Sequence, residues 1–103
     1  MEYTYLDHEI YKMKDEHNYL LHVTFPLLET GVVNINHTFV DVSLRGQGVA
    51  SKMMHETMKF LQSKDLKVVA TCPYAVVWLK KHKEYQAMIR QDLMDQLGTE
   101  CVI

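Results

Sequence analysis

The segment from Val32 to Cys72 constrains the fold more than any other part of the sequence. Residues 32–40, VVNINHTFV, alternate in polarity, which predicts one β-strand. The apolar face of that strand would hold Val33, Ile35, His37 and Phe39. Residues 47–63 repeat apolar side chains at helical spacing, and residues 66–72, LKVVATC, are typical of a strand covered on both faces. Strand, helix and strand in this order predict a parallel crossover unit.

The flanking segments predict antiparallel strands before this unit and helices after it. Strand-forming stretches at residues 10–14 and 19–25 flank the turn sequence DEHN, which predicts a hairpin. Pro26 and the following LLETG favour an irregular connection into a second hairpin. Beyond Pro73 the pattern predicts two short helices separated by a break near Lys83, the second over EYQAMIRQDLMDQL. The predicted fold class is mixed α/β, and 103 residues fit one domain.

The net charge bears on which partners to expect, and the cysteine content bears on the cellular location. A net charge of −2 and a pI near 6.3 give no electrostatic reason to expect DNA, RNA or an anionic membrane. With two cysteines, no secretory leader and no long apolar run, we expect an intracellular protein of the cytoplasm or the nucleus. Cys101 is third from the C-terminus rather than fourth, so we expect a loose tail residue and no prenyl anchor. Nothing in the sequence predicts an oligomer, and we expect a monomer.

The stretch RGQGVA, residues 45–50, follows the predicted strand and opens the predicted helix. A helix N-terminus leaves backbone N–H groups unpaired and attracts phosphate, and glycine keeps the approach open. Arg45 adds a cation beside these amides. The spacing fits neither the nucleotide-triphosphate loop nor the dinucleotide fingerprint. The residues alone therefore leave two interpretations, a phosphate site or a plain turn before a helix.

Four short motifs occur in order along residues 37–85, namely HTFV, RGQGVA, LKV followed by CP, and HKEY. In order and spacing they resemble the GNAT superfamily of acetyl-coenzyme A dependent N-acetyltransferases, and more narrowly its small single-domain members. The resemblance implies a minimal GNAT-like fold over residues 1–103. It also implies that the chain uses acetyl-coenzyme A as cosubstrate and transfers acetyl to an amine of a protein or small molecule.

The resemblance further implies where the coenzyme binds. The amides of residues 45–50 would hold its pyrophosphate, and the backbone of residues 38–40 would pair with its pantetheine arm. An unpaired N–H near Phe39 or Val40 would polarise the thioester carbonyl. The coenzyme-binding residues implied in this way are Thr38, Phe39, Val40, Arg45, Gly46, Gln47, Gly48, Val49, Ala50 and Tyr74.

Two departures from the family pattern affect these expectations. Most GNAT proteins carry a pair of helices after their first strand, whereas the residues before Val32 predict only strands and turns. We therefore expect an acceptor side that is open or built by another molecule. Many relatives also have proline after HTxV, whereas this chain has Asp41, which predicts a less rigid entry to the loop and a carboxylate near the pyrophosphate.

Cys72 and His37 are the candidate catalytic residues. Cys72 ends the buried strand just before Pro73, and it would accept the acetyl group as a nucleophile if a base activates it. His37, on the neighbouring strand, is the candidate base. Each has an alternative interpretation, because free cysteines often pack as small apolar side chains and histidines on apolar faces are often structural. The remaining histidines show no ligand spacing with the cysteines, so no metal site is predicted.

Two mechanisms and two rival functions follow from these alternatives. The amine attacks the bound thioester directly, or Cys72 is acetylated first and then passes the acetyl group on. The first rival is a non-catalytic acyl-coenzyme A binding or protein-interaction module whose open cleft docks a protein segment. The second is a structural α/β domain that binds no coenzyme.

Overall fold

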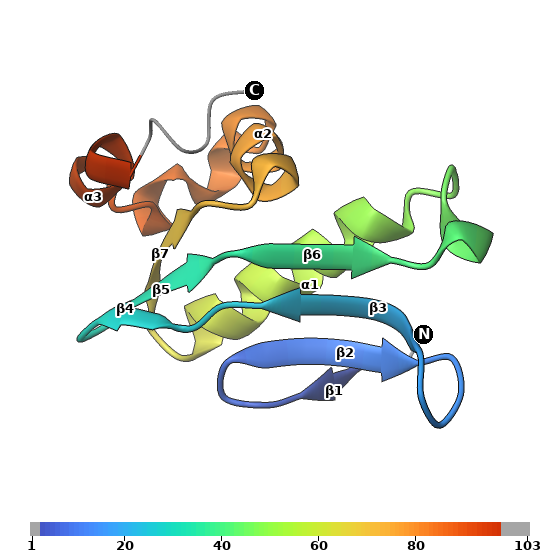
Figure 1. Cartoon of the computed structure of the whole chain (residues 1–103). Coiled ribbons are helices and arrows are strands. Elements are labelled where there is room, and N and C mark those ends of the chain that lie inside the picture. Colours follow the sequence, from blue (N-terminus) through green and yellow to red (C-terminus); the bar gives the residue numbers. More distant parts are fainter. Residues whose placement is uncertain (1–2, 98–103) are drawn as a thin grey trace.

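The computed structural model describes residues 3–97 and divides their strands between two sheets (Figure 1). The first sheet has the order β1 (Thr4–Tyr5), β2 (Glu9–Met13), β3 (Tyr19–Thr24) and β6 (His37–Val40). The second has the order β4 (Leu27–Glu29), β5 (Val32–Ile35) and β7 (Lys67–Ala70). All neighbours are antiparallel except β5 and β7, which are parallel. This arrangement confirms the mixed α/β fold with antiparallel strands before the crossover.

The hairpin of β2 and β3 forms as predicted, because its turn is fixed by one carboxylate. Asp15 Oδ1 accepts the backbone N–H of both His17 and Asn18 at 2.9 Å. The segment LLETG is more regular than predicted, since its first three residues form β4. A turn at Gly31, whose φ is +79°, then reverses the chain into β5.

The predicted single strand over residues 32–40 is wrong, because the chain breaks at Asn36. Before the break β5 pairs with β7, and after the break β6 pairs with β3, where Thr38 faces Val23. Asn36 is the extra residue, so the alternation of side chains shifts by one position. Ile35 and Thr38 therefore both point toward the core, and His37 is exposed rather than part of the apolar face.

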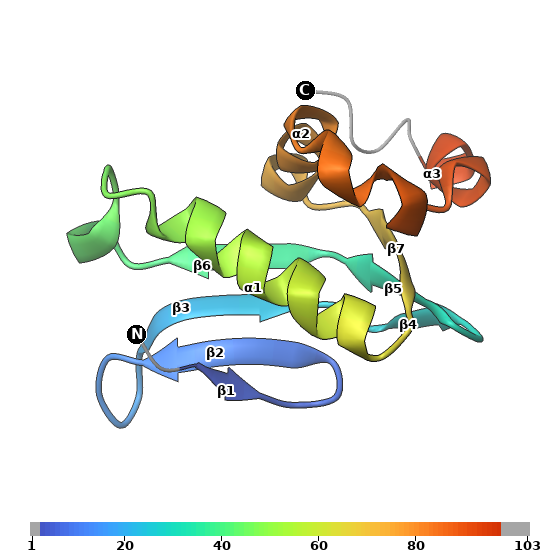
Figure 2. The same cartoon turned by 180° about the vertical axis from the view of Figure 1, so that it is seen from behind.

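Helix α1 (Val49–Ser63) covers one face of the first sheet and supplies much of the core (Figure 2). It begins at Val49 rather than at Gln47, because Gly48 takes a left-handed conformation at the N-cap. Its buried apolar side chains are Val49, Met53, Met54, Met58 and Leu61. Figures 1 and 2 show no helix of the described residues on the opposite face of β2, β3 and β6.

The strand β7 is covered on both faces, as predicted, since Val68, Val69 and Ala70 are all fully buried. Cys72 lies just beyond it, as the N-cap of α2 (Pro73–Lys81), where proline occupies the first turn. The thiol shares the core with Val68 and Ala70, as the parity of the segment predicts.

The second C-terminal helix was predicted as continuous and is broken in the structure. The 3-10 helix η2 (Lys83–Met88) ends before Ile89, which is extended, and α3 (Gln91–Leu97) follows. Ile89 bridges Val68 in parallel, and the Arg90 N–H donates to the Val68 carbonyl at 3.0 Å. The free edge of β7 thus takes up these residues and interrupts the helix. Cys101 lies outside the described residues.

Between residues 3 and 97 no helix combines the length and the apolar character that crossing a membrane requires.

Candidate active site

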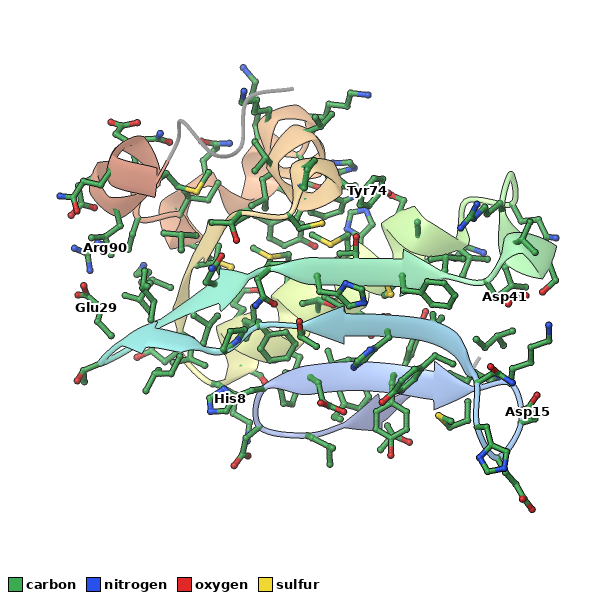
Figure 3. All side chains as sticks on the ribbon, viewed as in Figure 1. His8, Asp15, Glu29, Asp41, Tyr74 and Arg90 are labelled. Atoms are coloured by element: carbon green, nitrogen blue, oxygen red, sulfur yellow. The ribbon has the colours of Figure 1, made fainter. Side chains whose placement is uncertain are left out.

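The loop between β6 and α1 begins with a short 3-10 turn, η1 (Val42–Leu44). Asp41, shown where β6 ends in Figure 3, accepts from both the backbone N–H and the hydroxyl of Ser43 at 3.1 and 2.6 Å. These hydrogen bonds lower the pKa of Asp41, and Lys14 lies 3.4 Å from the same carboxylate. The side chain of Asp41 therefore caps the turn, and the lower rigidity expected of the loop entry without proline stays a prediction.

The second half of the loop presents backbone amides to solvent. Gly46 and Gly48 have φ values of +84° and +74°, and a Cβ placed on either would meet no atom within 4 Å. Within the described part of the chain, the amides of residues 46–51 donate no hydrogen bond to a protein group. They belong to the loop and to the first turn of α1, where N–H groups are left unpaired and the helix dipole is positive. Such a combination has the chemistry that suits an anion.

Among the described residues β6 is the edge strand of its sheet, so no other strand pairs with one side of its backbone. The Asp41 N–H donates to the Leu20 carbonyl at 2.8 Å, and inter-strand bonds in an antiparallel ladder fall on alternate residues. The backbone groups of Thr38 and Val40 therefore point away from β3. Consistent with this direction, the Val40 carbonyl accepts from Arg45 Nε at 3.3 Å. An extended ligand chain can pair with the amides of this edge.

The thiol of Cys72 lies where β5 and β6 separate. Its Sγ is 3.2 Å from Thr38 Oγ1, and its backbone N–H donates to the Ile35 carbonyl at 3.2 Å. The residue is 8% exposed, so the thiol lies at the margin of the core that it shares with Val68 and Ala70. The structure thus brings together the strand of the HTFV motif and the cysteine of the LKVVATCP segment.

His37 is not beside Cys72. Thr38 contacts the thiol, and the next side chain along a strand points to the opposite face, so the imidazole of His37 lies on the face that no helix covers. There its ring is 5.6 Å from the ring of His22, which stacks on Tyr19 at 4.0 Å. A cavity of about 540 Å³ opens at this place, lined by Lys14, His17, Asn18, Tyr19, His22, His37, Phe39 and Asp41.

His22 is a functional candidate that sequence reasoning missed. Its Nε2 is buried without a hydrogen-bond partner, and the closest carboxylate oxygen, on Glu9, is 3.7 Å away. Burial lowers the pKa of His22, and the neighbouring His37 acts in the same direction, against the opposing effect of Glu9. Only the pairing of β3 with β6, in which His22 faces Phe39, would have revealed this neighbourhood.

The two tyrosines near the motifs lie in different surroundings. Tyr74, at the start of α2 in Figure 3, is 40% exposed, and partial burial raises the pKa of its phenol. Tyr85 is buried, and its hydroxyl lies 3.0 Å from His55 Nδ1. Tyr74 is therefore open to a ligand, whereas Tyr85 packs inside the protein. In the part of the chain that the structure describes, no three His, Cys, Asp or Glu side chains group closely enough to hold a metal ion.

Comparison with known proteins agrees with the fold. The family model of the GCN5-related N-acetyl-transferases matches residues 9–88. The solution structure of a GCN5-like N-acetyltransferase candidate from Staphylococcus aureus is similar, with 31% identity, a TM-score of 0.72, and coverage of 85% of this chain and 86% of that one. No curated protein matches the sequence. The chain belongs to the GCN5-related N-acetyltransferase family and is an acetyltransferase.

Proposed function

We propose that the protein transfers acetyl from acetyl-coenzyme A to an amine, with the loop of residues 45–50 holding the coenzyme. The unpaired amides of residues 46–51 beside the free edge of β6 carry this proposal. A pyrophosphate fits these amides and the Arg45 guanidinium, and the pantetheine arm fits the edge of β6 near Thr38 and Val40. Tyr74, exposed at the start of α2, would contact the same arm. A cytoplasmic location and a monomeric state also stay predictions.

The position of Cys72 supports a two-step transfer. The Cys72 thiolate attacks the acetyl carbonyl carbon, so a new S–C bond forms while the bond to the coenzyme sulfur breaks. The proton that Cys72 gave up ends on the released coenzyme thiol. The acceptor nitrogen then attacks the acetyl-cysteine, the S–C bond breaks as the amide forms, and the proton that the amine gives up balances the one that returns the Cys72 thiolate to a thiol. The Val40 N–H would stabilise the developing oxyanion. The Thr38 hydroxyl, whose oxygen is 3.2 Å from the sulfur, would stabilise the thiolate.

The acceptor amine approaches, on this proposal, from the face that carries His37. That face carries the cavity lined by His22, His37 and Phe39, and no helix of the described residues covers it. An amine must lose a proton to become an amide, and on this proposal the exposed imidazole of His37 would receive it. His37 would therefore act on the acceptor rather than on Cys72, whose hydroxyl partner is Thr38.

Titration calorimetry with coenzyme A tests the binding site. Gly48→Glu adds a side chain and a negative charge among the loop amides, so we expect its affinity for coenzyme A to fall at least tenfold, about the loss of one charge-assisted contact. Gly31→Glu is the matched control, because Gly31 has a similar φ of +79° and open surroundings in a different turn. Equal affinity in Gly48→Glu and the wild type would refute the site.

Mass spectrometry after incubation with acetyl-coenzyme A tests the role of Cys72. The experiment uses a Cys101→Ser background, so that Cys72 is the only thiol of the two in the sequence. An acetyl adduct that disappears in Cys72→Ala, together with a loss of turnover, supports the two-step route. Turnover that persists in Cys72→Ala without an adduct supports direct transfer. Coenzyme binding without transfer to any amine or peptide would favour the non-catalytic module instead.

A further inference from the structure

Four rings from three elements pack together at the side of α1 that faces α2. His55 belongs to α1, Trp78 to α2 and Tyr85 to η2, and His82 is the C-cap that joins α2 to η2. The His82 ring stacks on Trp78 at 3.8 Å with 13° between the planes, and Tyr85 lies over the same indole at 5.7 Å and 23°. His55 meets Trp78 edge-on at 4.8 Å. We call this set the ring cluster.

Hydrogen bonds fix the ring cluster at each of its members. His55 Nδ1 is 3.0 Å from the Tyr85 hydroxyl, and His82 Nδ1 donates to the Trp78 carbonyl at 2.8 Å, because a carbonyl oxygen only accepts. The indole N–H of Trp78 donates to Ser51 Oγ at 2.9 Å. Trp78 is 4% exposed, so removal of this acceptor would leave a buried donor unpaired.

The bond between Trp78 and Ser51 joins the two halves of the proposed site. Ser51 lies in the first turn of α1, directly after the glycine loop whose amides point to solvent. Trp78 lies in α2, whose N-cap is Cys72. One hydrogen bond and one ring cluster therefore connect the helix that starts at the loop to the helix that starts at the thiol. The HKEY motif, which supplies His82 and Tyr85, otherwise has no place in the site.

We propose that Ser51 and Trp78, held by the ring cluster, are positioning residues that set the distance between the glycine loop and Cys72. This inference rests on the proposed function. A coenzyme anchored at the loop reaches Cys72 with its reactive carbon only if that separation is correct, and misplacement by an ångström lowers transfer rates about a hundredfold. On the proposed function, the loop and the edge of β6 supply most of the contacts to the coenzyme and Tyr74 of α2 adds one, whereas transfer requires the correct distance between the loop and the thiol.

Ser51→Ala tests whether transfer depends on this hydrogen bond while coenzyme binding does not, and Ser51→Thr is the rescue variant that keeps the hydroxyl. We expect Ser51→Ala to lower kcat about tenfold while Kd for coenzyme A stays within about twofold, because only the position of the thiol changes. Ser51→Thr should restore kcat. Ser63→Ala is the matched control, since that hydroxyl donates to a carbonyl at the far end of the same helix. An unchanged kcat, or a Kd that rises as much as kcat falls, would overturn the proposal.

Two measurements without coenzyme separate this inference from the proposed function. Trp78 is the only tryptophan in the chain, so its emission reports the ring cluster directly. In a Cys101→Ser background, alkylation by iodoacetamide reports the exposure of Cys72. Ser51→Ala should change the emission and raise the alkylation rate severalfold, and Ser51→Thr should do neither. If Ser51→Ala matches the wild type in both, the ring cluster does not hold α2, whether or not the protein transfers acetyl.

Discussion

The contact between Thr38 and Cys72 is the residue-scale feature on which the proposed chemistry depends most. A hydroxyl that donates to the sulfur favours the thiolate, and a hydrogen bond to a charged group contributes about 1.5–3 kcal/mol. We predict that Thr38→Val slows the reaction of Cys72 with iodoacetamide about tenfold at constant pH. Thr38→Ser, which keeps the hydroxyl, should react like the wild type. Equal rates for Thr38→Val and the wild type would show that the 3.2 Å contact does not activate the thiol.

His22 makes the stability of the protein depend on pH. Burial lowers its pKa below the ordinary value of 6.5, so between the two pKa values the unfolded chain binds more protons than the folded one. Neutral His22 therefore contributes fully to the stability of the folded protein above pH 6.5, and this contribution is lost as the pH falls through the pKa of His22 in the folded state. We predict that Tm falls less on acidification from about pH 7.5 to about pH 5 in His22→Gln than in the wild type.

The control for this measurement is His17→Gln, because His17 is exposed in the turn between β2 and β3. It should show the same decrease in Tm as the wild type. An equal decrease in all three proteins would mean that another group controls the acid sensitivity.

Several residues of the candidate site could be predicted from the sequence alone. The loop of residues 45–50 and Cys72 were found because their motifs are contiguous in the chain. The orientation of His37 could not be found, because it depends on one extra residue at Asn36 that local alternation does not reveal. The hydroxyl of Thr38 was missed for the same reason, since a strictly alternating strand would have pointed it away from the thiol.

At the scale of elements, Gly48 determines where α1 begins. Its φ of +74° is unfavourable for any residue with a Cβ, although the surrounding space is open. We predict that Gly48→Ala lowers the free energy of unfolding by about 1 kcal/mol in urea titration, through backbone strain alone. Gly48→Asn should lower the free energy of unfolding by less, because asparagine tolerates the left-handed region and suits an N-cap. An alanine variant as stable as the wild type would show that the loop relaxes to a different conformation.

The predicted element boundaries agree with the structure where a local sequence pattern sets them. They differ where a strand distant in the sequence pairs with the segment. The hairpin of β2 and β3 is specified by its own turn residues, and α1 by its own periodicity. The helix predicted after Glu84 is interrupted because Ile89 pairs with Val68 of β7, a contact between distant parts of the chain. Periodicity within a window cannot register such a contact.

At the scale of the whole molecule, stability depends on the layer between α1 and the sheets. Met53, Met54 and Met58 are fully buried there, so the core relies on flexible thioether side chains. We predict that Met58→Ala lowers the free energy of unfolding by about 2–5 kcal/mol, because a cavity replaces a buried side chain. Lys59→Ala, at the next and exposed position, should change it by less than about 0.5 kcal/mol. Comparable losses in both variants would contradict this account of the core.

The general architecture was predictable, and the location of its uncovered face was not. Apolar patterning indicated which segments are buried, but it did not show that β5 and β6 belong to different sheets. One face of β2, β3 and β6 also has no helix from the described residues. The aromatic and imidazole side chains of that face come from β2, β3 and β6, so only the assembled sheet brings them together.

The break at Asn36 also behaves as a single-residue insertion in an otherwise continuous strand. Ile35 faces the core, His37 faces out and Thr38 faces in, so deleting Asn36 would restore strict alternation without moving any of these side chains to the other face. The chain after β7 turns into α2, so β6 has no parallel neighbour among the described residues on that side, and the backbone groups of Thr38 and Val40 stay open there. In this fold, one extra residue marks where the chain leaves the sheet of β4, β5 and β7 for the sheet in which β6 is the edge.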